Sequence, residues 1–135
     1  MTLLLHTSSP TIRIGLAEGD RIVAREHFPT DRNLAEILAD RVRQLFRKNT
    51  FHLSAVRSVV VHAGPVSRGF TSLRIGVTTA NAVAYALGIP VVGVAGDISA
   101  LDGLLEQSKT VAPPPSGIVI PLYAKEPDIG PVPTR

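Results

Sequence analysis

Apolar and polar residues alternate along the first part of the chain in the pattern of short β-strands. Residues 3–5 form an apolar run that ends in a turn of the sequence Thr-Ser-Ser-Pro. Residues 12–17 then alternate between large apolar side chains and polar or small ones, which is the period of a half-buried strand. Glu18-Gly19-Asp20 turns the chain back, so we expect residues 21–28 to pair with this strand as a hairpin.

Spacings of three and four between apolar residues predict a helix after this hairpin. Thr30 and Asp31 are good helix caps, and the periodic pattern continues as far as Asn49. The residues that define the apolar face are Leu34, Ile37, Leu38, Val42, Leu45 and Phe46. The basic residues of 41–48 are interpreted as the solvated face of this helix, because the aromatic residues that stack on nucleic-acid bases are almost absent.

Two valine-rich runs, within residues 58–63 and 91–94, have the composition of fully buried strands. A helix over 71–87, ended by Gly88 and Pro90, is predicted between them, and a short helix over about 98–107 follows. The order of these elements predicts an α/β fold, in which a β-hairpin leads a mixed sheet whose later strands are joined by crossover helices.

The end of the chain is rich in proline. Pro113-Pro114-Pro115 cannot form a helix or a central strand, whereas residues 117–122 could form a last strand. We therefore divide the chain into one domain over 1–110, a proline-rich spacer over 111–117, and a final strand with an extended tail over 118–135.

The 22 residues from Ile75 to Gly96 carry no formal charge. Within the helix over 71–87, polar side chains after the first turn are few: Thr78, Thr79, Asn81 and Tyr85. A surface helix normally shows a polar stripe to water, so we expect a second molecule to pack on this one. Complete burial beneath the third helix and the tail is the alternative. The apolar part is too short to span a membrane.

Composition narrows the function classes. The chain of 135 residues has a net charge of +3 and lacks cysteine, which excludes disulfides, thiolate zinc sites and a cysteine nucleophile. The amino-terminal residues do not have the pattern of a signal peptide. Together these features favour a cytoplasmic protein.

The loop that leads into the second helix is a candidate site for an anion or nucleotide. The amino terminus of a helix attracts anions, and the residues considered for this site are Gly64, Pro65, Ser67, Gly69, Phe70, Thr71 and Arg74. An ordinary turn capped by Thr71 or Ser72 is the simpler interpretation. No Gly-Lys-Ser/Thr follows, so this is not a Walker A loop.

No catalytic or metal-binding residues are predicted. His6 and His62 end predicted central strands and are expected to be neighbours, but they lack a carboxylate partner. Asp102 and Glu106 share one helix face, which we interpret as solvated. Ser8, Ser9 and Ser67 have no nucleophile elbow and no identifiable base in the sequence.

Several motifs together resemble the TsaB (YeaZ) family. These are Gly64-Pro65, the segment Phe-Thr-Ser-Leu-Arg-Ile-Gly over 70–76, the alanine-rich helix, and Leu-Gly-Ile-Pro-Val-Val-Gly-Val over 87–94. The opening Leu-His-Thr-Ser and the closing Pro-Leu-Tyr-Ala-Lys are also similar to the family pattern. The resemblance covers residues 1–107 and 118–130, and implies an actin-like, ribonuclease-H-like domain without most of the family's second domain.

The resemblance implies a non-catalytic scaffold subunit in the synthesis of threonylcarbamoyladenosine in tRNA. Such a subunit binds and activates the catalytic subunit TsaD through its two main helices, works with the ATPase TsaE, contacts tRNA indirectly, and forms a homodimer when alone. Any ATP or ADP would be held at an interface shared with the partner. The expected interface residues are Leu34, Ile37, Val42, Leu45, Thr78, Asn81, Ala84 and Tyr85.

One departure from the family pattern bears on nucleotide chemistry. His6 stands where the family has aspartate. Hydrated Mg²⁺ prefers oxygen ligands, so a neutral imidazole argues against autonomous nucleotide chemistry. Two alternatives remain: a small nucleotide-binding actin-like enzyme, and a homodimeric adaptor with a different partner.

Overall fold

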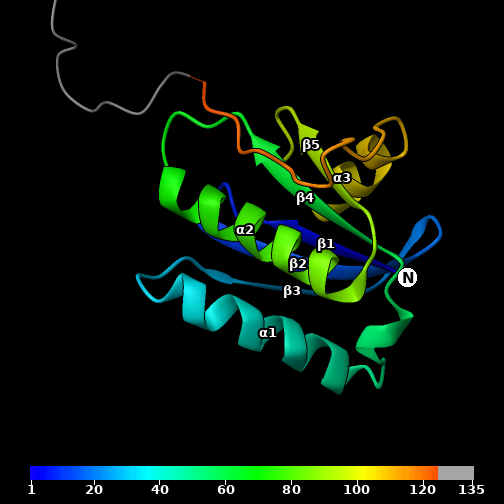
Figure 1. The fold of residues 1–135 in the computed structure, drawn as a ribbon. Coiled ribbons are helices and arrows are strands. Elements are labelled where there is room, and N and C mark those ends of the chain that lie inside the picture. Colours follow the sequence, from blue (N-terminus) through cyan, green and yellow to red (C-terminus); the bar gives the residue numbers. More distant parts are fainter. Residues whose placement is uncertain (125–135) are drawn as a thin grey trace, which may run out of the picture.

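The computed structural model describes residues 1–124 and shows a sheet covered by helices on both faces (Figure 1). The strands are β1 (Thr2–His6), β2 (Thr11–Glu18), β3 (Arg21–Pro29), β4 (Ser58–Gly64) and β5 (Val91–Ala95). The helices are α1 (Leu34–Lys48), the short 3-10 helix η1 (Leu53–Ala55), α2 (Phe70–Leu87) and α3 (Leu101–Ser108). Apart from η1 and the last expected strand, this order follows the prediction, and 1–110 contains every helix and strand described.

The sheet is mixed, with the strand order β3-β2-β1-β4-β5. β2 pairs antiparallel with both β1 and β3, whereas β4 pairs parallel with both β1 and β5. The predicted hairpin-led sheet with crossover helices is therefore confirmed. Because β1 and β4 are parallel neighbours, with Leu5 opposite Val61, the next residues of the two strands, His6 and His62, meet at one edge of the sheet.

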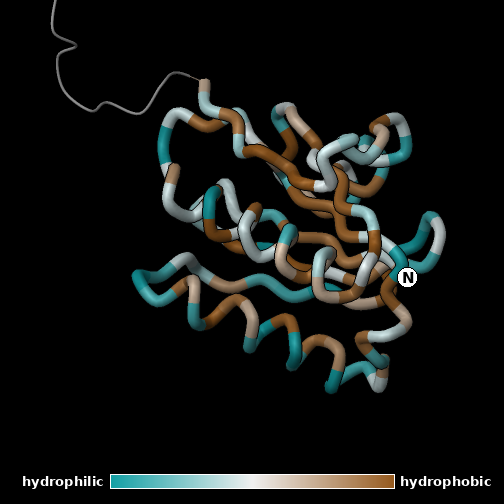
Figure 2. The backbone as a smooth tube through the Cα atoms, viewed as in Figure 1, coloured by the Kyte–Doolittle hydropathy of each residue, from teal (hydrophilic) through white to brown (hydrophobic). Residues whose placement is uncertain are grey.

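Two apolar layers hold the helices on the sheet. Leu3 and Leu5 of β1 belong to the core beneath α1 and α2, whereas Leu4, which points to the opposite face, belongs to the core beneath α3. In Figure 2 many residues of the sheet are brown, which marks them as apolar, whereas teal, polar residues lie on the outer turns of α1. Burial on both faces explains why the valine runs of β4 and β5 lack alternation.

Helix α2 packs closely on the turn after β1 because Gly76 has no side chain. A Cβ atom at this position would lie 2.8 Å from Thr7 Cγ2 and would overlap Thr7 Oγ1. Thr7 is fully buried, and its hydroxyl donates to the carbonyl of Ser72 in α2 at 2.7 Å. The end of α2 at Gly88, in a left-handed conformation with φ of 65°, agrees with the prediction.

The helix starts differ from the predictions. Asn33, rather than Thr30 or Asp31, precedes α1, and it makes no side-chain capping bond. Gly69 precedes α2, so neither Thr71 nor Ser72 is its cap. Helix α3 begins at Leu101 rather than near residue 98, because residues 96–100 form the connection from the end of β5 to the helix. Local sequence identified suitable capping residues, but the path of the chain between strand and helix determined which residue stands at each start.

The prediction of a last strand over 117–122 is wrong. The segment binds α2 as well as the sheet: the side chain of Asn81 accepts from Val119 N at 2.9 Å and donates to Val119 O at 3.0 Å. Leu122 N then donates to Ala63 O at 2.7 Å, and Tyr123 forms an isolated bridge with Val66. The Asn81 side chain binds the N–H and C=O groups of Val119, which a strand would pair with a neighbouring strand. No regular strand forms over 117–122 for this reason. The expected tail over 125–135 lies outside the described residues.

No helix within residues 1–124 combines the length and the apolar character needed to cross a membrane.

Candidate functional site

The predicted anion loop connects β4 to α2 and lies mostly at the surface. Ser67, Gly69, Thr71 and Arg74 are exposed, whereas Gly64 and the half-buried Phe70 are covered by the carboxyl-terminal segment. The Phe70 ring meets Tyr123 edge-on, with the ring centroids 5.1 Å apart. Ala124 N also donates to Val66 O at 2.9 Å. The loop motif and the closing motif of the TsaB resemblance therefore contact each other. The carboxyl-terminal segment holds one side of the loop in place.

Gly64 is required at the start of this loop. Its φ is +100°, a conformation that other residues rarely adopt, and a Cβ atom there would overlap the Leu122 carbonyl oxygen. The tight approach of residue 122 explains the glycine without any ligand. Of the two interpretations of the loop, the structure favours an ordinary connection tied to the carboxyl-terminal segment.

The predicted proximity of His6 and His62 is confirmed. Their rings stack with centroids 4.5 Å apart and planes inclined by 1°. His6 is 2% exposed and His62 is 4% exposed. The Nε2–H group of His6 donates to the carbonyl of Ile98, and that of His62 donates to Gly96 O at 2.7 Å. Because a carbonyl can only accept, both rings carry their proton on Nε2.

The two Nδ1 atoms differ. His62 Nδ1 accepts from the hydroxyl of Ser8, whereas His6 Nδ1 is buried without a partner. Burial lowers the pKa of both histidines from 6.5, because the charged form loses its hydration. For His62 the nearby Asp97 carboxylate opposes this effect; for His6 the ring of His62 adds to it. Both imidazoles are therefore neutral at pH 7.

The stacked histidines line a cavity of about 390 Å³ at the carboxyl ends of β1, β4 and β5, which we call the histidine cavity. Its lining residues are His6, Ser8, Ser9, His62, Pro65, Val66, Gly96, Asp97, Ile98 and Ser99. In residues 1–124 no group of three or more histidine, cysteine or acidic residues could hold a metal ion. The cavity instead offers hydroxyl groups beside a neutral base. The sequence interpretation that Ser8 lacks a base is corrected here.

The acidic residues of α3 form no pair with catalytic geometry. Asp102 binds Arg25 in an exposed ion pair at 3.0 Å, which lowers the pKa of this carboxyl group through the hydrogen bond. Glu106 binds Lys109 at 3.1 Å. The prediction that Asp102 and Glu106 share a solvated face is confirmed.

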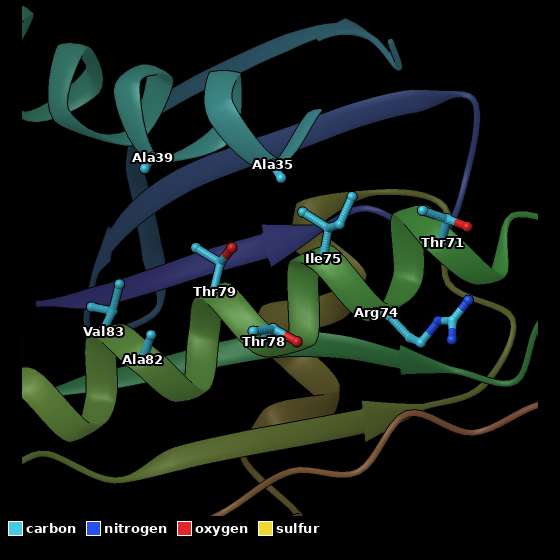
Figure 3. A pocket seen from close by; sticks show the side chains of 9 residues that line it. All are labelled: Ala35, Ala39, Thr71, Arg74, Ile75, Thr78, Thr79, Ala82 and Val83. Carbon is cyan, nitrogen blue, oxygen red and sulfur yellow. The ribbon is translucent and has the colours of Figure 1, made fainter. Parts of the chain in front are cut away.

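The outer faces of α1 and α2 enclose a groove of about 470 Å³, which we call the α1–α2 groove (Figure 3). It is lined by Ala35, Ala39, Thr71, Arg74, Ile75, Thr78, Thr79, Ala82 and Val83. Most of these side chains are small or apolar, and Arg74 is the one charged residue among the nine. Figure 3 shows Ala35 and Ala39 of α1 opposite Ile75 and Thr79 of α2.

Half of the expected interface residues do not reach this outer face. Leu34, Val42, Leu45 and Ala84 are at most 5% exposed and pack in the core of the chain itself. Their periodicity marks the face of each helix that covers the sheet. They are therefore corrected to core residues in this structure.

The other expected interface residues have different surroundings. Ile37 is half-buried against the core, and Asn81 is occupied by Val119. Thr78 and Tyr85 are exposed, Tyr85 to 91%. Thr78 also lines a second hollow, which Tyr85 borders together with residues 116–118.

Sequence reasoning missed most of the groove. The signal was present as small residues beside the core positions: Ala35 and Ala39 are four apart on α1, and Ile75, Thr79 and Ala82 are four and three apart on α2. Small residues let another helix approach closely, so the groove has the shape and composition of a helix-packing surface.

A family model and solved structures show to which family the chain belongs. The family model TsaD, described as tRNA N6-adenosine threonylcarbamoyltransferase, matches residues 28–122, which is more than half of the chain. The chain belongs to this family. Within it the chain is of the TsaB (YeaZ) type, since it is similar to the structure described as YeaZ from Pseudomonas aeruginosa, with 30% identity and a TM-score of 0.62.

The chain spans less than half the length of the YeaZ structures that it matches. The match covers 70% of the chain but 43% of the Pseudomonas YeaZ structure, and 42% of a second structure described as an uncharacterized protein with similarity to peptidase YeaZ from the same organism. RuvC from Thermus thermophilus, in complex with a Holliday junction substrate, matches 81% of the chain at 12% identity and a TM-score of 0.55. That likeness shows the fold alone. No curated protein sequence matches the chain significantly.

Proposed function

We propose that the protein is a non-catalytic scaffold subunit in threonylcarbamoyladenosine modification of tRNA, and that it binds a TsaD-like catalytic subunit through the α1–α2 groove. The observation that carries this proposal is the groove itself, an open surface of small and apolar side chains on two adjacent helices. Family membership and the likeness to YeaZ support the modification role.

The composition of the groove favours a helical partner. Exposed apolar surface is stabilised when a second molecule removes it from water, and alanine side chains allow helix axes to approach to about 8–10 Å. α1 and α2 lie side by side on the same face of the sheet, so an equivalent pair from the partner would complete a four-helix contact (Figure 1). The partner would be ordered by this contact, while the chain itself performs no step of the modification.

The proposal places the protein in the cytoplasm, with the tRNA held chiefly by its partners. A TsaE-like ATPase is a further expected partner, and any ATP or ADP would be held at the interface shared with the catalytic subunit. The match covers less than half of the YeaZ structure, so the proposal is limited to the contacts of α1 and α2.

Replacing Ala82 with arginine tests the groove. Ala82 is exposed, so Ala82→Arg should leave the fold intact, but it would bury an unpaired charge in the complex. We expect the affinity for the TsaD-like subunit from the same genome to fall at least about 100-fold, equivalent to about 2.7 kcal/mol. Sizing-column light scattering would show the one-to-one complex, and calorimetric titration would give the affinity.

Ala55→Arg is the matched control, since Ala55 is exposed in η1 and does not line the groove. This variant should bind as the unchanged protein does. Equal affinity of a folded Ala82→Arg protein would contradict the proposed surface. A homodimer that persists when the TsaD-like subunit is added would favour the adaptor alternative.

A further inference from the structure

Ser8 and His62 form a hydrogen-bonded pair that the scaffold role does not use. The Ser8 hydroxyl donates to Nδ1 of His62, and the opposite ring nitrogen, Nε2–H, donates to the Gly96 carbonyl at 2.7 Å. The imidazole is therefore held in the one tautomer that can accept the serine proton. A hydroxyl, a base and a group that orients the base are the parts of an activated serine nucleophile.

The fold holds these parts rigidly. His62 belongs to β4, which is paired on both sides, and Gly96 directly follows β5. The ring of His6 stacks on His62 and is itself fixed by the Ile98 carbonyl. Rotation of His62 away from Ser8 would break the bond to Gly96 and the stack together. Ser8 is only half-buried and lines the histidine cavity, so a ligand there reaches its hydroxyl.

The charges around His62 suit proton transfer. Burial lowers the pKa of His62, so the ring is unprotonated and able to act as a base at neutral pH. The stacked His6 is also neutral, because burial lowers its pKa as well. Asp97, which lines the same cavity, favours the imidazolium once it forms. A group that is neutral at rest and stabilised when charged is suited to general-base catalysis.

We propose that Ser8 is a nucleophile for small acyl esters bound in the histidine cavity, with His62 as its general base. The volume of about 390 Å³ suits a small substrate, and Pro65, Val66 and Ile98 give the cavity an apolar side. Asp97 is the one carboxylate among its lining residues, and no lysine or arginine lines it. Neutral or cationic esters are therefore favoured over anionic ones.

The reaction balances with water as the only second reactant. Ser8 Oγ bonds to the ester carbonyl carbon while its proton passes to His62 Nδ1. The bond from that carbon to the leaving oxygen then breaks, and the leaving alcohol takes the proton from His62. Water gives a proton to His62 and attacks the acyl-Ser8 ester. The acid is released, and Ser8 regains its proton.

This site is independent of the proposed function. The histidine cavity and the α1–α2 groove share no residue, so loss of one activity leaves the other testable. Binding of the TsaD-like subunit by a Ser8→Ala protein should be unchanged. Failure of the Ala82→Arg experiment would equally leave the reactivity of Ser8 in place.

A fluorophosphonate probe on the full chain tests the proposal, because such probes phosphonylate activated serines with loss of fluoride. We expect peptide mass spectrometry to find the label on Ser8, and Ser8→Ala to remove it. His62→Gln should slow labelling at least about 100-fold. Ser9→Ala is the matched control: its hydroxyl lines the same cavity but donates to Thr11 O, so labelling of Ser8 should persist. The rate of p-nitrophenyl acetate hydrolysis should likewise be lost in Ser8→Ala, fall in His62→Gln and persist in Ser9→Ala.

Two results would overturn the proposal. One is the absence of label on Ser8 in the folded, unchanged protein; the other is equal labelling of several surface serines. If His62→Gln does not fold, the labelling rate of the unchanged protein against pH replaces it. That rate should fall as His62 gains its proton below pH 6.5, whereas a serine that reacts without a base would show no such step.

Discussion

Gly76→Ala is expected to destabilise the protein by about 3 kcal/mol, toward the upper end for overpacked cores. The new Cβ would overlap Thr7 Oγ1 and lie 2.8 Å from Thr7 Cγ2. Thr7 cannot turn away, because it is fully buried and its hydroxyl is bonded to Ser72 in the same helix. α2 must therefore move off the sheet. Thermal unfolding should show a fall in Tm of roughly 10 °C.

Gly103→Ala is the control for helix propensity. Gly103 lies in α3, where a new Cβ would meet only Ile98 Cγ2 at 3.5 Å, an ordinary contact. This variant should be neutral or up to about 1 kcal/mol more stable, since alanine favours helices over glycine. In a Thr7→Ala background, Gly76→Ala should cost less than it does alone. An equal cost in both backgrounds would contradict the assigned clash.

Stability should fall as the pH is lowered below 6.5, because two histidines are buried in the neutral form. Burial lowers the pKa of His6 and His62 in the folded protein, while the unfolded chain binds protons near pH 6.5. Below that value the unfolded state holds more protons than the folded state, so protonation favours unfolding. Each histidine contributes up to about 1.4 kcal/mol per pH unit between the ordinary and the lowered pKa. Above pH 6.5 their contribution is fully present.

Urea unfolding at pH 7.5, 6.5 and 5.5 measures this dependence. The interval lies above the ordinary pKa of carboxyl groups and spans that of histidine. His52→Gln is the matched control for the loss of a histidine side chain, since His52 is exposed. His6→Gln should reduce the slope if the variant folds. A free energy of unfolding that is constant from pH 7.5 to 5.5 would contradict the buried neutral pair.

Much of the fold was predictable because its signals are local. The period of two in residues 12–17, the valine runs and the helical spacing of α1 each reflect which face of one element is buried. His6 and His62 were each predicted to end a central strand and to be neighbours, and the parallel pairing of β1 and β4 confirms this. The family motifs were also readable as sequence, and Gly76 within them has a steric reason in the structure.

The sites were less predictable because they depend on side chains from distant segments. Ala84 and Val42 have the same apolar character as Ala82 and Ala39, but the first two face the sheet and the last two face outward. Composition cannot separate these faces in α2, where Arg74 is the one charged residue. The base for Ser8 lies 54 residues along the chain, so no local motif revealed it.

The sequence by itself determined the order of the elements, the mixed sheet and the family, because these depend on periodicity and on short motifs. Only the tertiary structure decided which helix face is open, where the helices begin, and how the carboxyl-terminal segment is bound. Asn81 shows the reason most directly: its side-chain amide forms hydrogen bonds with the N–H and C=O groups of Val119, and this long-range contact replaces the strand predicted over 117–122. Long-range contacts of this kind override local preference.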